Sequence, residues 1–214
     1  MLPLYDDIPA RRPAIFTYAL IIANILIFLA TKNDMGYYAV EYGIIPARVW
    51  ADGSFFSVNF LTYMFMHGSW LHLLGNMLYM WIFANNVEDA LGYIKFPIFY
   101  ILSGYIAALV HVFLFPNSHA PLIGASGAIS GILAAYMILY PYAGIHTFVF
   151  LGFFITIAKI PAFFYIGFWF FSQIFGLFGG PERIAWDAHI SGFVGGLLLL
   201  KIFLPNYQDY QIRH

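Results

Sequence analysis

Long apolar runs dominate the pattern of hydrophobic and polar positions along the chain, and short polar or proline-containing segments separate them. A helix needs about 20 apolar residues, within a range of about 17–25, to cross the hydrocarbon core of a bilayer. Pro13, Pro121 and Pro161 stand where such runs begin, in positions that suit the first turn of a helix. The predicted spans cover residues 14–30, 70–87, 96–115, 122–140, 162–178 and 186–204.

Two segments outside these runs are also rich in apolar or aromatic residues. Residues 143–160 could continue the fifth span, but Lys159 would then cost at least about 2.5 kcal/mol at the centre of a bilayer. We therefore expect this segment to be an interfacial or re-entrant connection. The first loop, residues 31–69, mixes aromatic residues with few charges, so we expect it to dip into the headgroup region.

Composition supports a membrane protein, because 62% of the residues are hydrophobic and 9% are charged. A soluble domain has roughly 45–50% and roughly 25%. The sequence predicts an all-α polytopic membrane protein with six transmembrane helices, in one domain over residues 1–214 with its core at about 13–204. A formal charge of −1 gives no basic surface for nucleic acid, and the lack of Cys excludes disulfides and Cys-based metal sites.

The distribution of Lys and Arg predicts the orientation. Six spans place both termini on one side of the membrane. If that side is the cytoplasm, six of the nine Lys and Arg residues lie inside and three outside, as the positive-inside rule favours. We expect a multi-pass protein in the cell membrane of a prokaryote, surrounded by lipid, with cytoplasmic termini.

Polar residues lie near the N-terminal ends of the second, fourth and sixth spans. Such residues are costly in a span, and they indicate either hydrogen bonds between helices or a functional site. His72 and Asn76 are four residues apart and so share one helix face. Ser126 begins the fourth span and His189 the sixth, at a similar depth toward the outer face. The three helices therefore bring a serine, two histidines and an amide to one layer.

Small residues accompany the serine and the histidine. Glycines spaced by four let two helix backbones approach closely in lipid. If the glycine faces of the fourth and sixth spans meet, Ser126 and His189 come toward hydrogen-bonding distance. The glycines are Gly127 and Gly131 in the fourth span and Gly192 and Gly196 in the sixth.

These residue types suit a serine hydrolase. A serine hydroxyl becomes nucleophilic when a base takes its proton, and a neutral imidazole suits that role. The developing oxyanion then needs hydrogen-bond donors aimed at it. Backbone N–H groups are unpaired where a helix begins, and side-chain donors lie in the second span. The candidate donors are the backbone at Gly124, Ala125 and Ser126 and the side chains of His72 and Asn76.

Three motifs resemble those of the rhomboid intramembrane serine proteases. They are "GASG" at 124–127, "AHISG" at 188–192 and "HGSWLHLLGN" at 67–76, and "VEDALG" at 87–92 is similar to the family's second-span exit. The resemblance covers residues 13–204 and implies a rhomboid-like bundle of six helices. It implies hydrolysis of a peptide bond in or beside the transmembrane segment of a membrane-protein substrate, without a metal or cofactor.

The resemblance also implies roles for individual residues. Ser126 would be the nucleophile, and His189 would be the base that later protonates the leaving amine. The oxyanion hole would consist of His72, Asn76 and the amides of Ser126 and Ala125. Residues 163–171 and 176–183 occupy the places of the family's gate and cap. Two departures are Ser130, where some members have a tyrosine, and the lack of a clear Trp-Arg pair in the first loop.

Other functions and residue roles compete with this hypothesis. A catalytically silent relative that binds or escorts membrane clients is the main alternative. A transporter would more often show internal repeats, and a metalloprotease would need a motif such as H-E-x-x-H, although His67, His72 and His189 could gather a metal. We expect Ser130 to bond its own helix and His67 to tie the first loop to the second span. We expect Asp187 to point away from His189.

Overall fold

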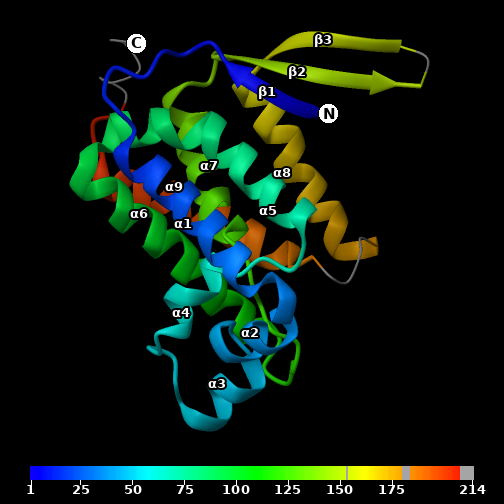
Figure 1. The fold of residues 1–214 in the computed structure, drawn as a ribbon. Coiled ribbons are helices and arrows are strands. Elements are labelled where there is room, and N and C mark those ends of the chain that lie inside the picture. Colours follow the sequence, from blue (N-terminus) through cyan, green and yellow to red (C-terminus); the bar gives the residue numbers. More distant parts are fainter. Residues whose placement is uncertain (153, 180–183, 208–214) are drawn as a thin grey trace.

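The computed structural model describes residues 1–152, 154–179 and 184–207. Helices form a bundle, and a small antiparallel sheet lies at one end of it (Figure 1). The helices are α1 (Ile15–Thr31), α2 (Met35–Tyr42), α3 (Pro46–Asp52), α4 (Asn59–Thr62), α5 (Trp70–Tyr79), α6 (Asn85–Leu114), α7 (Ser126–Leu139), α8 (Ala162–Gly179) and α9 (Trp186–Phe203). The strands are β1 (Leu2–Asp6), β2 (Gly144–Leu151) and β3 (Phe154–Pro161).

Most of the predicted spans lie in long apolar helical stretches. In the described part of the chain, four stretches are long and apolar enough to cross a membrane: Ile15–Tyr42, Trp70–Leu114, Ala162–Gly179 and Trp186–Phe203. The 45-residue stretch Trp70–Leu114 contains two of the predicted spans. Gly92 breaks it with a φ of 78°, a conformation that glycine adopts without strain. The predicted fourth span corresponds to the shorter apolar helix Ser126–Leu139.

Helix α7 lies in the interior of the bundle, and nearly all of its residues are buried. Its glycines face those of α9 at backbone contact. A Cβ added to Gly192 would overlap the carbonyl oxygen of Gly127, and one added to Gly196 would overlap the backbone of Gly131. The close approach of α7 and α9 therefore depends on positions that have no side chain.

The prediction of an all-α fold is wrong at residues 143–160. This segment forms the hairpin β2–β3, and β1 pairs with β2 to give the strand order β1-β2-β3. Its β-branched and aromatic residues suit a strand, and Gly152 adopts a φ of 62° at the turn. The register places Phe148 opposite Ile157. Hydrophobicity alone does not separate a short strand from an apolar helical segment.

Side chains attach the sheet to the end of α7. The hydroxyl of Tyr136 donates to Asp6 Oδ2 at 2.5 Å, and burial raises the pKa of Asp6 to about 6. Asp7 accepts from the Gly144 amide at 2.8 Å and pairs with Lys159 Nζ at 2.6 Å. Burial opposes ionisation of Asp7, but these two partners outweigh it and lower the pKa of the carboxyl. The N-terminal strand is thus joined to both the bundle and the hairpin.

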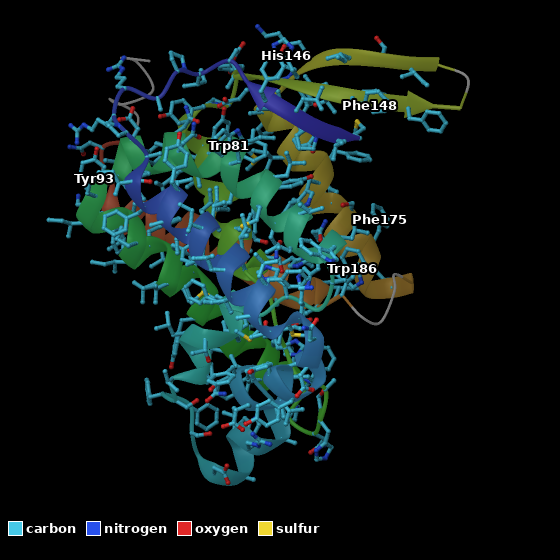
Figure 2. All side chains as sticks on the ribbon, viewed as in Figure 1. Trp81, Tyr93, His146, Phe148, Phe175 and Trp186 are labelled. Atoms are coloured by element: carbon cyan, nitrogen blue, oxygen red, sulfur yellow. The ribbon has the colours of Figure 1, made fainter. Side chains whose placement is uncertain are left out.

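The first loop folds into the short helices α2, α3 and α4, at the end of the bundle far from the sheet (Figure 1). Trp50 packs edge-on against Phe55 and Phe113 and donates its indole N–H to the Val112 carbonyl at 3.0 Å. The loop is therefore packed against α6. Trp186 also lies far from the sheet residues His146 and Phe148, at the opposite end of α8 (Figure 2).

Candidate active site

Ser126 and His189 are in direct contact. Ser126 begins α7 and His189 lies in the first turn of α9, and 2.8 Å separates Ser126 Oγ from His189 Nε2. The backbone contact between Gly127 and Gly192 brings the two helices this close. A serine hydroxyl and an imidazole nitrogen at this distance form the pair that base-assisted nucleophilic attack requires.

The chain enters α7 in a conformation that depends on glycine. Residue 124 has a φ of 119°, which side-chain-bearing residues rarely adopt, and its amide donates to the Tyr63 carbonyl at 2.8 Å. A Cβ there would lie 2.6 Å from His72 Nε2. Helix α7 begins at Ser126 rather than at residue 122 as predicted. The reason is that Leu122 pairs with Ile44 in an isolated β-bridge and residue 124 is not helical.

His72 and Asn76 of α5 face the backbone in front of Ser126. An ideal Cβ on Gly124 would lie 2.6 Å from His72 Nε2 and 3.7 Å from Asn76 Nδ2. The Ser69 hydroxyl caps α5 by accepting from the His72 amide at 3.2 Å. These contacts bring both predicted side-chain donors to the entrance of α7.

His67 supports this arrangement from the first loop. It is fully buried, and 2.9 Å separates its Nε2 from Asn76 Nδ2. Burial, with a smaller effect of His72, lowers the pKa of His67 to about 4. The neutral ring can then accept one of the two amide protons of Asn76, which leaves the other available. His67 thus links the first loop to α5, as expected.

Gln173 contacts the candidate base, and it is not among the site residues predicted from the sequence. Its Oε1 lies 2.8 Å from His189 Nδ1, and its side chain is only 4% exposed. The residue belongs to α8, in the aromatic stretch "FFYIGFWFFSQIFG". A lone amide in such a stretch is itself an indication of a polar contact between helices. Trp169 and Trp186 flank the same imidazole, with ring centroids 6.1 and 6.2 Å away.

Two other polar residues near the site bond elsewhere. Asp187 Oδ2 lies 2.8 Å from His111 Nδ1 on α6, so its carboxylate points away from His189 as expected. Ser130 donates to the Ser126 carbonyl at 2.7 Å, within its own helix. In the described ranges, no three His, Asp or Glu residues group in a way that could hold a metal ion.

Part of the predicted cap, residues 180–183, lies outside the described residues. The predicted gate residues 163–171 belong to α8. Several phenylalanines of this helix point away from the bundle and are more than 60% exposed: Phe164, Phe168, Phe171 and Phe175. The opposite side of α8 carries Gln173 to the imidazole.

The structure contains several helices long enough to span a membrane and a serine–histidine pair between two of its helices. These features place the protein among multi-pass integral membrane proteins. Comparison with protein families narrows this class. The Rhomboid domain family matches residues 54–206, which is more than half of the 214-residue chain. The protein belongs to the rhomboid domain family, and the resemblance noted from its motifs is confirmed.

Similar proteins come from plants, insects and fungi. Rhomboid-like protein 11, chloroplastic, of Arabidopsis thaliana is 36% identical over 36% of this chain and 27% of its own length. Inactive rhomboid protein 1 of Drosophila melanogaster is 33% identical over 37% of the chain and 5% of its own length. Rhomboid protein 1, mitochondrial, of Saccharomyces cerevisiae is 28% identical over 69% of the chain and 44% of its own length. The chain thus covers less than half of each relative.

Proposed function

We propose that the protein is an intramembrane serine endopeptidase with Ser126 as nucleophile and His189 as general base and acid. The observation that carries this proposal is the 2.8 Å contact between Ser126 Oγ and His189 Nε2. The substrate class is a membrane protein whose scissile peptide bond lies in or beside a transmembrane segment. Neither a metal nor a cofactor takes part in the proposed reaction.

The reaction begins when Ser126 Oγ transfers its proton to His189 Nε2 and attacks the carbonyl carbon of the scissile bond. The tetrahedral intermediate collapses as the imidazolium gives that proton to the leaving amine. A water molecule, deprotonated by the same nitrogen, then hydrolyses the acyl-enzyme and restores the serine. One imidazole nitrogen therefore serves in both halves of the reaction.

Donors for the oxyanion lie on two elements. The amide of Ser126 belongs to the unpaired N–H groups at the start of α7, where the helix dipole also favours negative charge. His72 and Asn76 add side-chain donors from α5, and Ala125 offers a second backbone amide. Such donors act in a water-poor site, where removal of one costs on the order of 10²–10³ in rate.

In this proposal the bundle crosses the membrane six times. The break at Gly92 divides the Trp70–Leu114 stretch into two passes, and α7 forms a short pass inside the bundle. Both termini then face the cytoplasm, and Ser126 faces the outer side of a prokaryotic cell membrane. A substrate helix arriving through the lipid reaches Ser126 from the side, past the exposed phenylalanines of α8.

An escort function without catalysis is the alternative, because the fly relative carries the word inactive in its name. Removal of the Ser126 hydroxyl oxygen distinguishes the two functions experimentally. In liposomes that contain a single-span substrate, Ser126→Ala should lower cleavage by about 10⁴-fold or more, since the nucleophile is gone. Ser130→Ala is the matched control, because that hydroxyl bonds only within its own helix among the described contacts.

Three results would contradict the serine mechanism. Cleavage that survives Ser126→Ala would show that another group attacks the bond. Cleavage abolished by EDTA would favour a metal-dependent reaction. A wild-type protein that binds a broad panel of membrane substrates and cleaves none would favour the escort function.

A further inference from the structure

The proposed base can act only if His189 presents an unprotonated Nε2 to Ser126. A neutral imidazole carries its single proton on either nitrogen, and the hydrogen bond at the other nitrogen decides which. In this site the other nitrogen is Nδ1, and it contacts Gln173 Oε1 at 2.8 Å. The state of the base therefore depends on the orientation of a buried amide.

The surroundings of Gln173 determine that orientation. Its Nε2 donates to the Trp169 carbonyl at 2.9 Å, and a carbonyl can only accept. The NH₂ group also lies 2.9 Å from Ser172 Oγ, whose own proton goes to the same carbonyl. A flipped amide would place its oxygen against the Trp169 carbonyl and lose these bonds. The amide oxygen is therefore the atom that faces His189.

We propose that Gln173 is a positioning residue that holds the proton of His189 on Nδ1 and turns the lone pair of Nε2 toward Ser126. An amide oxygen has no proton to donate, so Nδ1 must supply the hydrogen in the contact with Gln173. Nε2 is then the acceptor in the contact with Ser126. Gln173 thus takes the place that a carboxylate has in a serine–histidine–aspartate triad. This inference rests on the proposed function.

A neutral partner suits this position. Gln173 is 4% exposed and belongs to an apolar helix, where an ionised carboxylate would be costly. The amide gives the same directional acceptor without a charge. It also gives two donors that secure its own orientation on α8.

Gln173 makes the base depend on the position of α8. Helix α8 lies at the periphery of the bundle, where Phe168 and Phe171 are exposed, and it follows directly on the hairpin (Figure 1). Its inner side contacts α9 through Gln173 and His189 and through the stacked rings of Phe170 and Phe193. A displacement of α8 away from α9 would break the bond to Nδ1 and release the imidazole. The proposed hydrolase thus reaches its full rate only while α8 is docked.

Spectroscopy can test the position of the proton without any substrate. The full chain is labelled with ¹⁵N-histidine in detergent micelles, and ¹H–¹⁵N correlation spectra distinguish Nδ1–H from Nε2–H rings. The chain has seven histidines, so the His189 signal is identified by its loss in His189→Gln. We expect an Nδ1–H ring in the wild type and a mixture or an Nε2–H ring in Gln173→Leu.

Kinetics test the consequence. Gln173→Leu should lower kcat by about 10–100-fold with little change in KM, the range found when the hydrogen-bond partner of a metal-bound histidine is removed. In Gln173→Glu the protonated acid can donate its O–H to the Trp169 carbonyl and keep its carbonyl oxygen at Nδ1, so this variant should retain the Nδ1–H ring and most of the rate. Ser191→Ala is the matched control, because this hydroxyl near His189 bonds only carbonyls of its own helix among the described contacts, and its loss leaves the Gln173 oxygen on Nδ1. If Gln173→Leu does not fold, Gln173→Met and Gln173→Glu serve for the same comparison.

A folded Gln173→Leu or Gln173→Met protein with a wild-type His189 spectrum and a wild-type kcat would overturn the inference. An Nε2–H ring in the wild type would also overturn it. Neither result changes the expected outcome of the Ser126→Ala experiment, so the inference about Gln173 can fail while the proposed function holds. Conversely, cleavage that survives Ser126→Ala refutes the proposed function even if the spectra show the expected ring.

Discussion

The two ends of α7 are held in different ways. At the Ser126 end, backbones touch at Gly127 and Gly192, and the serine contacts an imidazole one helix away. At the other end, side chains reach across to the sheet, as Tyr136 does to Asp6. Backbone contact leaves almost no freedom to adjust, whereas side-chain contacts can lengthen or rotate. We infer that the site end is rigid and that the sheet end can loosen locally.

The largest effect is expected from a side chain placed between α7 and α9. Gly192→Ala puts a methyl group against the carbonyl of Gly127, so the helices must separate. We expect a loss of about 1–3 kcal/mol in unfolding free energy, the usual cost of overpacking, together with loss of substrate cleavage. Unfolding in mixed detergent micelles and cleavage in liposomes measure the two effects.

Gly167→Ala provides the matched control, because a Cβ on Gly167 of α8 would meet nothing within 4 Å. It should leave stability unchanged or raise it by roughly 0.5–1 kcal/mol, the helix preference for alanine. Equal effects of the two substitutions would mean that the contact between α7 and α9 is no more demanding than the rest of the bundle. The contrast between the two ends would then be lost.

Much of the structure around Ser126 could be predicted, because short sequence motifs contain the residues that form it. Three pairs of residues are each spaced by four within one span: Gly127 and Gly131, Gly192 and Gly196, and His72 and Asn76. The similar depth of Ser126 and His189 in the membrane then predicted that these two residues lie close together. Gln173 was missed because its partner lies on another helix and nothing in its own neighbourhood repeats.

The sheet end could not be predicted in the same way. The bond between Asp6 and Tyr136 joins residues 130 positions apart, and no local pattern relates them. The segment "IHTFVFLGFFITIAKI" has the β-branched and aromatic composition of strands, but in a chain this apolar it also suits lipid. The pairing of β1 with β2, which sets Leu2 opposite Phe148, joins segments far apart in the sequence, so no local pattern predicts it.

A smaller effect, at the sheet end alone, is expected from pH. The pKa of Asp6 is raised to about 6 from 3.8, so the folded chain holds the extra proton more tightly than the unfolded chain. This contribution to stability is fully present below about pH 4 and is lost as the pH rises through about 6. Amide exchange in β1, corrected for intrinsic rates, should be about tenfold faster at pH 7 than at pH 5 through local opening.

Asp6→Asn should abolish this pH dependence, because a neutral amide cannot ionise and its oxygen can still accept from Tyr136. Exchange in α9 serves as the internal reference and should not follow the same pH profile. If α9 followed β1 through the same transition, the sheet and the site would open together. The sheet end would then be part of one cooperative unit with the site.

The smallest effect is expected at the ion pair between Lys159 and Asp7. Lys159 is 59% exposed, so Lys159→Met should change the protection of β2 by less than about 1 kcal/mol, and less in high salt. Asp7→Ala should lower the protection free energy of β2 by about 1 kcal/mol more than Lys159→Met, because it also removes the acceptor of the buried Gly144 amide. Cleavage should stay near wild type in both variants, since α8 keeps its contact with His189.

If Lys159→Met destabilised β2 more than Asp7→Ala, the ammonium rather than the bond to the Gly144 amide would hold the hairpin. If either variant lowered kcat, loosening of the hairpin would reach α8 and the bond from Gln173 to the base.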